Sequence, residues 1–112
     1  MIAQGSHASM KVILDLSTVL KTEDNHWLLN AELPETVALW IKSSFTKICL
    51  YVDSEAELLS LYEDAKRSNI ICALITDSGK TEFGGVPTNT CIAIGPHLSD
   101  EIDKITGHLK LL

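Results

Sequence analysis

The sequence lacks the features of membrane and secreted proteins. No apolar run approaches the length that a helix needs to cross a bilayer, and the first residues lack the cationic and apolar regions of a signal peptide. The cysteines, Cys49, Cys72 and Cys91, are odd in number, isolated and set among aliphatic residues. This pattern predicts small buried core residues rather than a disulfide framework or a metal site. We therefore expect a cytoplasmic protein without a membrane partner.

Basic residues are also scarce, with 9 lysines and arginines against 15 aspartates and glutamates and a formal net charge of −6. This balance disfavours a general nucleic-acid binder, whose affinity comes from many basic contacts to phosphates, although a local basic patch is compatible with it. The four histidines share no spacing typical of zinc ligands. Neither G-x-x-x-x-G-K-[ST] nor G-x-G-x-x-G occurs, so nucleoside triphosphate hydrolysis is not expected.

The 112 residues carry enough apolar content for one folded domain. Hydrophobic residues make up 46% and charged residues 21%, which is ordinary for a folded protein and wrong for a disordered one. The length leaves no room for two independent cores. We expect a single domain over residues 1–112.

Four helices are predicted along the chain. Apolar residues at near-helical spacing predict a first helix from Ala3 to about Val19. Pro34 suits the first turn of a second, shorter helix through PETVALWIKSS. Ser54, with a glutamate three residues later, forms a capping box at the start of the third. Ser99, followed by two acidic residues, opens the last.

Three short apolar segments, TKICLYVD, NIICALIT and TCIAIG, predict strands that are covered on both faces. The alternation of strands and helices predicts an α/β fold, a three-layer α/β/α sandwich with a small mixed sheet that is parallel at least in part. No strand precedes the first helix, so we expect a further strand upstream of Met1.

Two polar segments are candidates for a functional site. TDSGKTEFGGVPTNT follows a predicted strand, at the edge of the sheet where α/β folds bind ligands, but such a segment is also typical of a solvated surface hairpin. His7 stands near Gln4 and Ser6, and imidazole transfers protons near neutral pH. A histidine in a first helix is also commonly structural or exposed. Spacing alone leaves both interpretations open.

The segments IAQGSHAS, ITDSGKTE, CIAIGP and IDKITGHLKLL resemble the type II peptidyl-tRNA hydrolases of archaea and eukaryotes, in the order of that family. The resemblance is weakest between about Ser17 and Thr46. It implies hydrolysis of the ester bond between peptide and tRNA in peptidyl-tRNA, a sheet of four strands in the family, a homodimer, and no metal or organic cofactor.

Carried over by position, the resemblance implies that His7 and Asp77 polarise the attacking water and that Thr81 and Thr90 position water or substrate. Water needs such a base, and the oxyanion needs donors. Direct attack by water is favoured over an acyl-enzyme because no Ser-His-Asp arrangement is recognisable. The resemblance also implies substrate contacts at Gln4, Ser78, Gly79 and Lys80.

The sequence departs from the family at its start, where the N-terminal strand and a lysine-bearing glycine turn are missing. Truncation, a misassigned start codon and real loss are alternative explanations. Unpaired sheet edges in the absence of that strand favour a dimer. The missing lysine keeps a second hypothesis open, in which the chain is a non-catalytic relative that acts as a binding or regulatory module.

Overall fold

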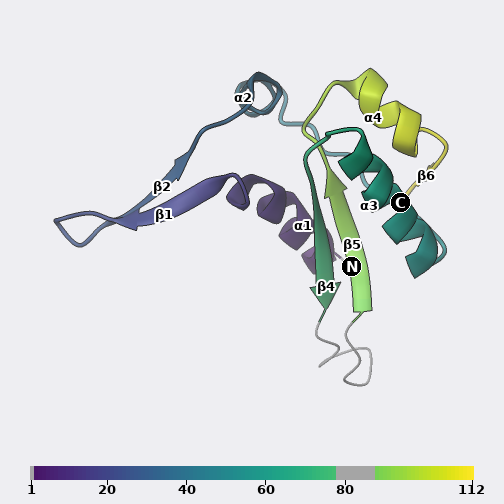
Figure 1. The fold of residues 1–112 in the computed structure, drawn as a ribbon, viewed down its shortest axis with the longest axis horizontal. Coiled ribbons are helices and arrows are strands. Elements are labelled where there is room, and N and C mark those ends of the chain that lie inside the picture. The colour runs from purple at the N-terminus through teal and green to yellow at the C-terminus, as the bar shows by residue number, and fades with distance from the viewer. Residues whose placement is uncertain (1, 78–87) are drawn as a thin grey trace.

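Helices are separated by single strands and by pairs of consecutive strands along the chain (Figure 1). The computed structural model describes residues 2–77 and 88–112, of which residues 2 and 77 are described by their backbone alone. This arrangement confirms the α/β fold class. The elements are α1 (Ile2–Leu14), β1 (Ser17–Lys21), β2 (Trp27–Ala31), α2 (Glu35–Lys42), β3 (Leu50–Tyr51), α3 (Glu55–Arg67), β4 (Cys72–Asp77), β5 (Thr88–Ile94), α4 (Ser99–Thr106) and β6 (Lys110–Leu111).

The β4–β5 pair lies between two helical layers. α1 packs across both strands, α3 also packs against both, and α4 packs against α3 (Figure 1). Ala73 and Ile75 of β4 are buried, as are Ala8 and Val12 of α1. The opposite face of the strand pair is turned to α3 and α4, because successive strand residues point to opposite faces. On that face, Cys72, Ile92 and Ile94 pack against a buried cluster. The cluster consists of Leu61, Ala65, Ile70 and Ile105.

The strands pair differently from the single mixed sheet expected from the sequence. Among residues 2–77 and 88–112 they form three separate antiparallel pairs, β1–β2, β3–β6 and β4–β5. The strands of β1–β2 and of β4–β5 follow each other directly, and parallel pairing needs a longer crossover, usually a helix, between its two strands. The expected parallel pairing is therefore wrong for the part of the chain that the structure describes.

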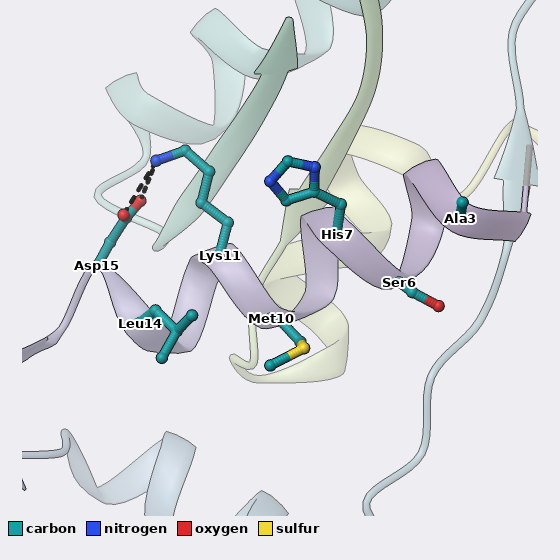
Figure 2. A pocket seen from close by; sticks show the side chains of 7 residues that line it. All are labelled: Ala3, Ser6, His7, Met10, Lys11, Leu14 and Asp15. Carbon is teal, nitrogen blue, oxygen red and sulfur yellow. Dashed lines mark hydrogen bonds and ion pairs between the residues drawn. The ribbon is translucent and has the colours of Figure 1, made fainter. Parts of the chain in front are cut away.

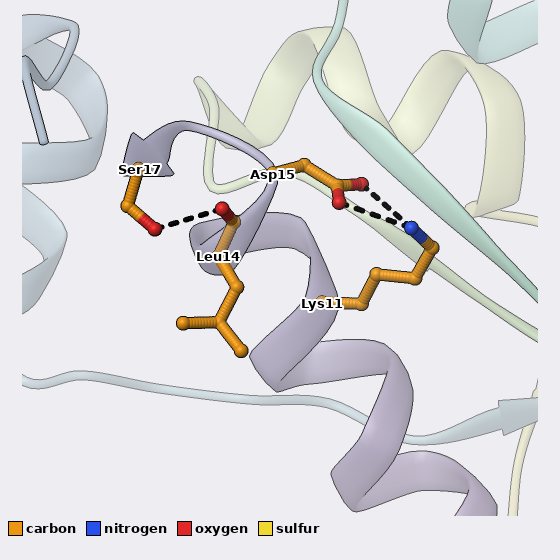
Figure 3. A network of polar contacts seen from close by, with 4 residues as sticks. All are labelled: Lys11, Leu14, Asp15 and Ser17. Carbon is orange, nitrogen blue, oxygen red and sulfur yellow. Dashed lines mark hydrogen bonds and ion pairs between the residues drawn. The ribbon is translucent and has the colours of Figure 1, made fainter. Parts of the chain in front are cut away.

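α1 ends at Leu14 instead of continuing to Val19. The Ser17 hydroxyl donates a 2.7 Å hydrogen bond to the Leu14 carbonyl, and the Lys11 ammonium lies 3.0 Å from Asp15 Oδ1 (Figure 3). Val19 lies in β1, which pairs with β2 in a hairpin that projects from the rest of the molecule (Figure 1). Its apolar side chain therefore belongs to a strand and not to the core-facing stripe of a helix.

The predicted strand TKICLYVD is shorter and more exposed than expected. Only Leu50–Tyr51 are paired, with Lys110–Leu111 near the C-terminus. This strand has a partner on one side alone within the described residues. Cys49, just before it, is exposed, while Cys72 and Cys91 are half-buried. The prediction of three buried cysteines is thus wrong for Cys49.

The predicted helix starts are confirmed. The Ser54 hydroxyl accepts a hydrogen bond of 3.1 Å from the backbone N–H of Glu57, as expected for an N-cap. Pro34 directly precedes α2, and Ser99 is the first residue of α4. No helix in residues 2–77 or 88–112 is long and apolar enough to span a membrane.

Candidate active site

The contact between α1 and β5 brings two predicted site residues together. The Thr90 hydroxyl donates a 3.1 Å hydrogen bond to Gln4 Oε1, and the bond is partly shielded from solvent. Gln4 lies in the first turn of α1, and Thr90 lies near the start of β5. The packing of the helix on the strand pair therefore joins positions 86 residues apart in the sequence.

Thr90 occupies an irregular position in the β4–β5 ladder. Ile75 pairs with Cys91 and Thr76 pairs with Asn89, so Thr90 has no partner residue on β4. One extra residue in one strand of an antiparallel pair is a β-bulge, a feature that is over-represented beside active sites because it redirects a side chain.

His7 lies one helical turn from Gln4, on the same side of α1, because helix positions three apart are neighbours. Its side chain is exposed. Figure 2 shows the imidazole leaving the helix on the same side as the Lys11 side chain. Within the described part of the chain, the His7 imidazole takes part in no hydrogen bond or ion pair. The imidazole is therefore accessible to water and to a substrate.

A shallow hollow of about 610 Å³ runs along the outer side of α1 (Figure 2). Its cation, Lys11, is engaged by Asp15, with the ammonium 3.0 and 3.1 Å from the two carboxylate oxygens. Besides this ion pair and His7, the lining side chains are small or apolar. The lining residues are Ala3, Ser6, His7, Met10, Lys11, Leu14 and Asp15.

Asp77 is the last residue of β4 and pairs with Thr88 in the ladder. Its backbone thus belongs to the strand pair that α1 packs against and that carries Thr90. The Asp77 side chain lies outside the described residues, so its convergence with His7 stays a prediction. The same holds for the whole of Ser78, Gly79, Lys80 and Thr81.

Cys91, the neighbour of Thr90, is not suited to act as a nucleophile. Burial raises the pKa of the Cys91 thiol, and the nearby Cys49 adds to that effect. A raised pKa keeps the thiol protonated at neutral pH, and the thiolate is the reactive form. Across residues 2–77 and 88–112, no group of three His, Cys, Asp or Glu side chains is arranged to hold a metal ion.

Sequence reasoning did not identify a polar network near the same end of the strand pair. The Thr76 hydroxyl donates a 2.7 Å hydrogen bond to Asn89 Oδ1, and the Asn89 amide donates one of 3.4 Å to Glu55 Oε1. Thr76 and Asn89 flank the glycine-rich segment on its two sides. Their positions on the two sides of one glycine-rich segment are a sequence signal that they pair, but the hydrogen bond to Glu55 in α3 depends on the fold.

Known proteins are similar to this chain along its whole length. The family model described as "Peptidyl-tRNA hydrolase PTH2" matches residues 1–112. The chain is 37% identical to the peptidyl-tRNA hydrolase of Methanocaldococcus jannaschii over 112 residues, which is 100% of this chain and 85% of that protein. Identity to the peptidyl-tRNA hydrolase of Sulfolobus acidocaldarius is also 37%, over 98% of this chain and 84% of that protein. The Drosophila melanogaster "Probable peptidyl-tRNA hydrolase 2" is 38% identical over 70% of this chain and 42% of its own length. The chain belongs to the PTH2 family of peptidyl-tRNA hydrolases.

Proposed function

We propose that this chain hydrolyses the ester bond between peptide and tRNA in peptidyl-tRNA and so releases the tRNA. The match of the family along residues 1–112 and the names of the archaeal relatives support this activity. The observation that carries the proposed site is the hydrogen bond from Thr90 to Gln4, one helical turn from the exposed His7.

The direction of that hydrogen bond supports a positioning role for Thr90. A threonine hydroxyl has one proton and two lone pairs. The Thr90 proton is directed to Gln4 Oε1, so the lone pairs are the part of the hydroxyl that receives a hydrogen bond. Such an acceptor orients a water molecule or a ribose hydroxyl. Thr90 therefore positions the attacking water or the end of the substrate.

His7 and Asp77 polarise the attacking water in this proposal. As the water oxygen bonds to the ester carbonyl carbon, its proton passes to the base, and the carbonyl oxygen becomes an oxyanion. The bond from carbon to the ribose oxygen then breaks, and the ribose oxygen receives the proton. The peptide leaves as an acid. In this proposal Thr81, like Thr90, positions water or substrate, and the contacts to the substrate come from Gln4, Ser78, Gly79 and Lys80.

The second hypothesis, a non-catalytic binding or regulatory module, is disfavoured by the comparisons. The relatives that match this chain along its whole length are named as hydrolases. A module that only binds would retain peptidyl-tRNA without releasing the peptide. The two hypotheses therefore differ in product formation and not in affinity.

Release of peptide from peptidyl-tRNA by this chain tests the proposal. We expect turnover by the parent chain and a loss of roughly a hundredfold or more in kcat for Asp77→Asn, because a general base or its partner contributes on that order. Asp53→Asn is the matched control, since Asp53 is exposed and lies outside the proposed site. Binding of peptidyl-tRNA without release of the peptide would contradict the proposed hydrolase activity. Equal turnover by Asp77→Asn and the parent chain would remove Asp77 from the proposed site.

We further propose that the chain acts in the cytoplasm as a homodimer. Apolar side chains on the projecting β1–β2 hairpin support the dimer. An exposed apolar hairpin whose outer edges have no partner strand among the described residues is a template for pairing with another chain. We propose that a second copy of this chain packs against these apolar side chains. The exposed apolar residues of the hairpin are Val19, Leu20, Trp27, Leu28 and Leu29.

A further inference from the structure

The bulge in β5 decides on which face of the strand pair Thr90 lies. Ile92 packs toward α3, so the preceding Cys91, which pairs with the buried Ile75, points to the α1 face. Regular alternation would turn Thr90 back to the α3 face. Thr90 nevertheless bonds to Gln4 in α1, so Thr90 and Cys91 both lie on the α1 face. The extra residue of the bulge accounts for this break in alternation.

Asn89 lies on the opposite face and is held there from two directions. Its amide donates to Glu55 Oε1, at the first residue of α3, over 3.4 Å. Its Oδ1 accepts a 2.7 Å hydrogen bond from the hydroxyl of Thr76, its partner in the ladder. The two bonds thus join Asn89 both to the neighbouring strand and to the helix that covers this face.

The hydrogen bond between Thr76 and Asn89 belongs to the register that follows the bulge. A slip of one residue, without the bulge, would place Thr90 opposite Thr76 and turn it away from Gln4. Burial of apolar side chains selects the register between Cys72 and Ile75, but both strands are polar beyond that point. The side-chain hydrogen bonds of Asn89 therefore contribute to the choice between the two registers there.

We propose that Asn89 is a positioning residue, which holds the bulge of β5 and thereby keeps the Thr90 hydroxyl directed to Gln4. This inference rests on the role in hydrolysis proposed above for Thr90. Asn89 itself lies on the face away from Gln4 and touches no reacting atom. It acts only through the backbone that it shares with Thr90.

Nuclear magnetic resonance spectroscopy tests the anchoring directly, without reference to activity. In the parent chain, we expect nuclear Overhauser effects between the Thr90 methyl and the Gln4 side-chain amide. Asn89→Ala, which removes both hydrogen bonds, and Thr76→Val, which removes one while keeping the side-chain shape, are expected to abolish or weaken these effects. Asn30→Ala, on the exposed hairpin, is the control. Unchanged effects in both Asn89→Ala and Thr76→Val overturn the inference.

Steady-state kinetics then test the link to catalysis. We expect Asn89→Ala to lower kcat by on the order of tenfold to a hundredfold, as misplacement of a catalytic group does, with little change in KM. In a Thr90→Val background the same substitution is expected to have no further effect, because Asn89 acts through Thr90. Independent losses that multiply overturn the inference. Loss of the Overhauser effects with an unchanged kcat overturns the role proposed for Thr90, and leaves the anchoring by Asn89 standing.

Discussion

The Thr90 hydroxyl donates a 3.1 Å hydrogen bond to Gln4 Oε1 and so joins the bulge of β5 to the first turn of α1. A hydrogen bond of this kind adds only about 1 kcal/mol to the free energy of unfolding. Its larger effect is on orientation, because it fixes the direction of a hydroxyl that is bonded to α1 one helical turn from the exposed His7. The proposed site is thus built where a helix crosses an irregular strand.

Removal of the Thr90 hydroxyl is expected to impair catalysis more than folding. Thr90→Val keeps the branched shape but has no group to hold water, so we expect kcat to fall by roughly tenfold to a hundredfold. Thr90→Ser, which keeps the hydroxyl, should retain most of the parent kcat. Steady-state assays with peptidyl-tRNA make the comparison. Equal kcat values for the valine and serine variants would show that the hydroxyl has no role.

Much of the fold followed from local signals. Ser54 with Glu57 predicted the start of α3, and the apolar runs around Leu74 and Ile92 predicted β4 and β5. The first helix was predicted too long because periodicity counts apolar residues without knowing what covers them. Val19 marks the predicted end of that helix, yet it pairs with Leu29 in the exposed hairpin.

The contact between Gln4 and Thr90 follows only in part from the sequence. The resemblance named Gln4 and Thr90, and the structure brings them into contact. The bulge that makes the contact possible depends on strand register, and no residue type in TNTCIAIG encodes it alone. Asn89 was missed for the same reason, since its partners Thr76 and Glu55 come from other elements.

The cysteines are expected to react with alkylating reagents at different rates. Cys49 is exposed, whereas burial raises the pKa of both Cys72 and Cys91 and so lowers their thiolate fraction at a given pH. Iodoacetamide labelling at neutral pH, followed by mass spectrometry of peptides, should find Cys49 modified first. The three rates should become similar in urea. Labelling of Cys91 as fast as Cys49 in the folded chain would contradict the packing of α1 on β5.

Gly95→Ala is expected to destabilise the fold. Gly95 follows β5 with a φ of 89°, and a Cβ there would lie 2.9 Å from Ile102 Cδ1 in α4. We expect a loss of about 1–3 kcal/mol in the free energy of unfolding, measured by urea denaturation. Gly5→Ala is the matched control because a Cβ at Gly5 meets open space within a helix, where alanine is preferred. Similar midpoints for Gly95→Ala and the parent would be inconsistent with this turn.

A charge on the β1–β2 hairpin is expected to weaken the proposed dimer. Leu28, 53% exposed, lies opposite Leu20 in the hairpin. Leu28→Lys should raise the dimer dissociation constant by roughly tenfold or more, because it places an ammonium in an apolar interface. Thr18→Lys adds the same charge to the hairpin without removing an apolar group. Sedimentation equilibrium decides the matter, and a parent chain that is monomeric at every concentration would rule out this dimer.

Two histidine variants, one in the proposed site and one far from it, give the sharpest test of the proposed site. His7 borders the hollow on α1, and His26 lies at the turn of the distant hairpin, 3.0 Å from the Asp24 carboxylate. We predict that His7→Ala lowers kcat for peptidyl-tRNA hydrolysis by on the order of a hundredfold or more, the usual contribution of an acid–base group, while His26→Ala leaves it unchanged. Equal kcat values for the two variants and the parent chain would contradict the assignment of the site to α1.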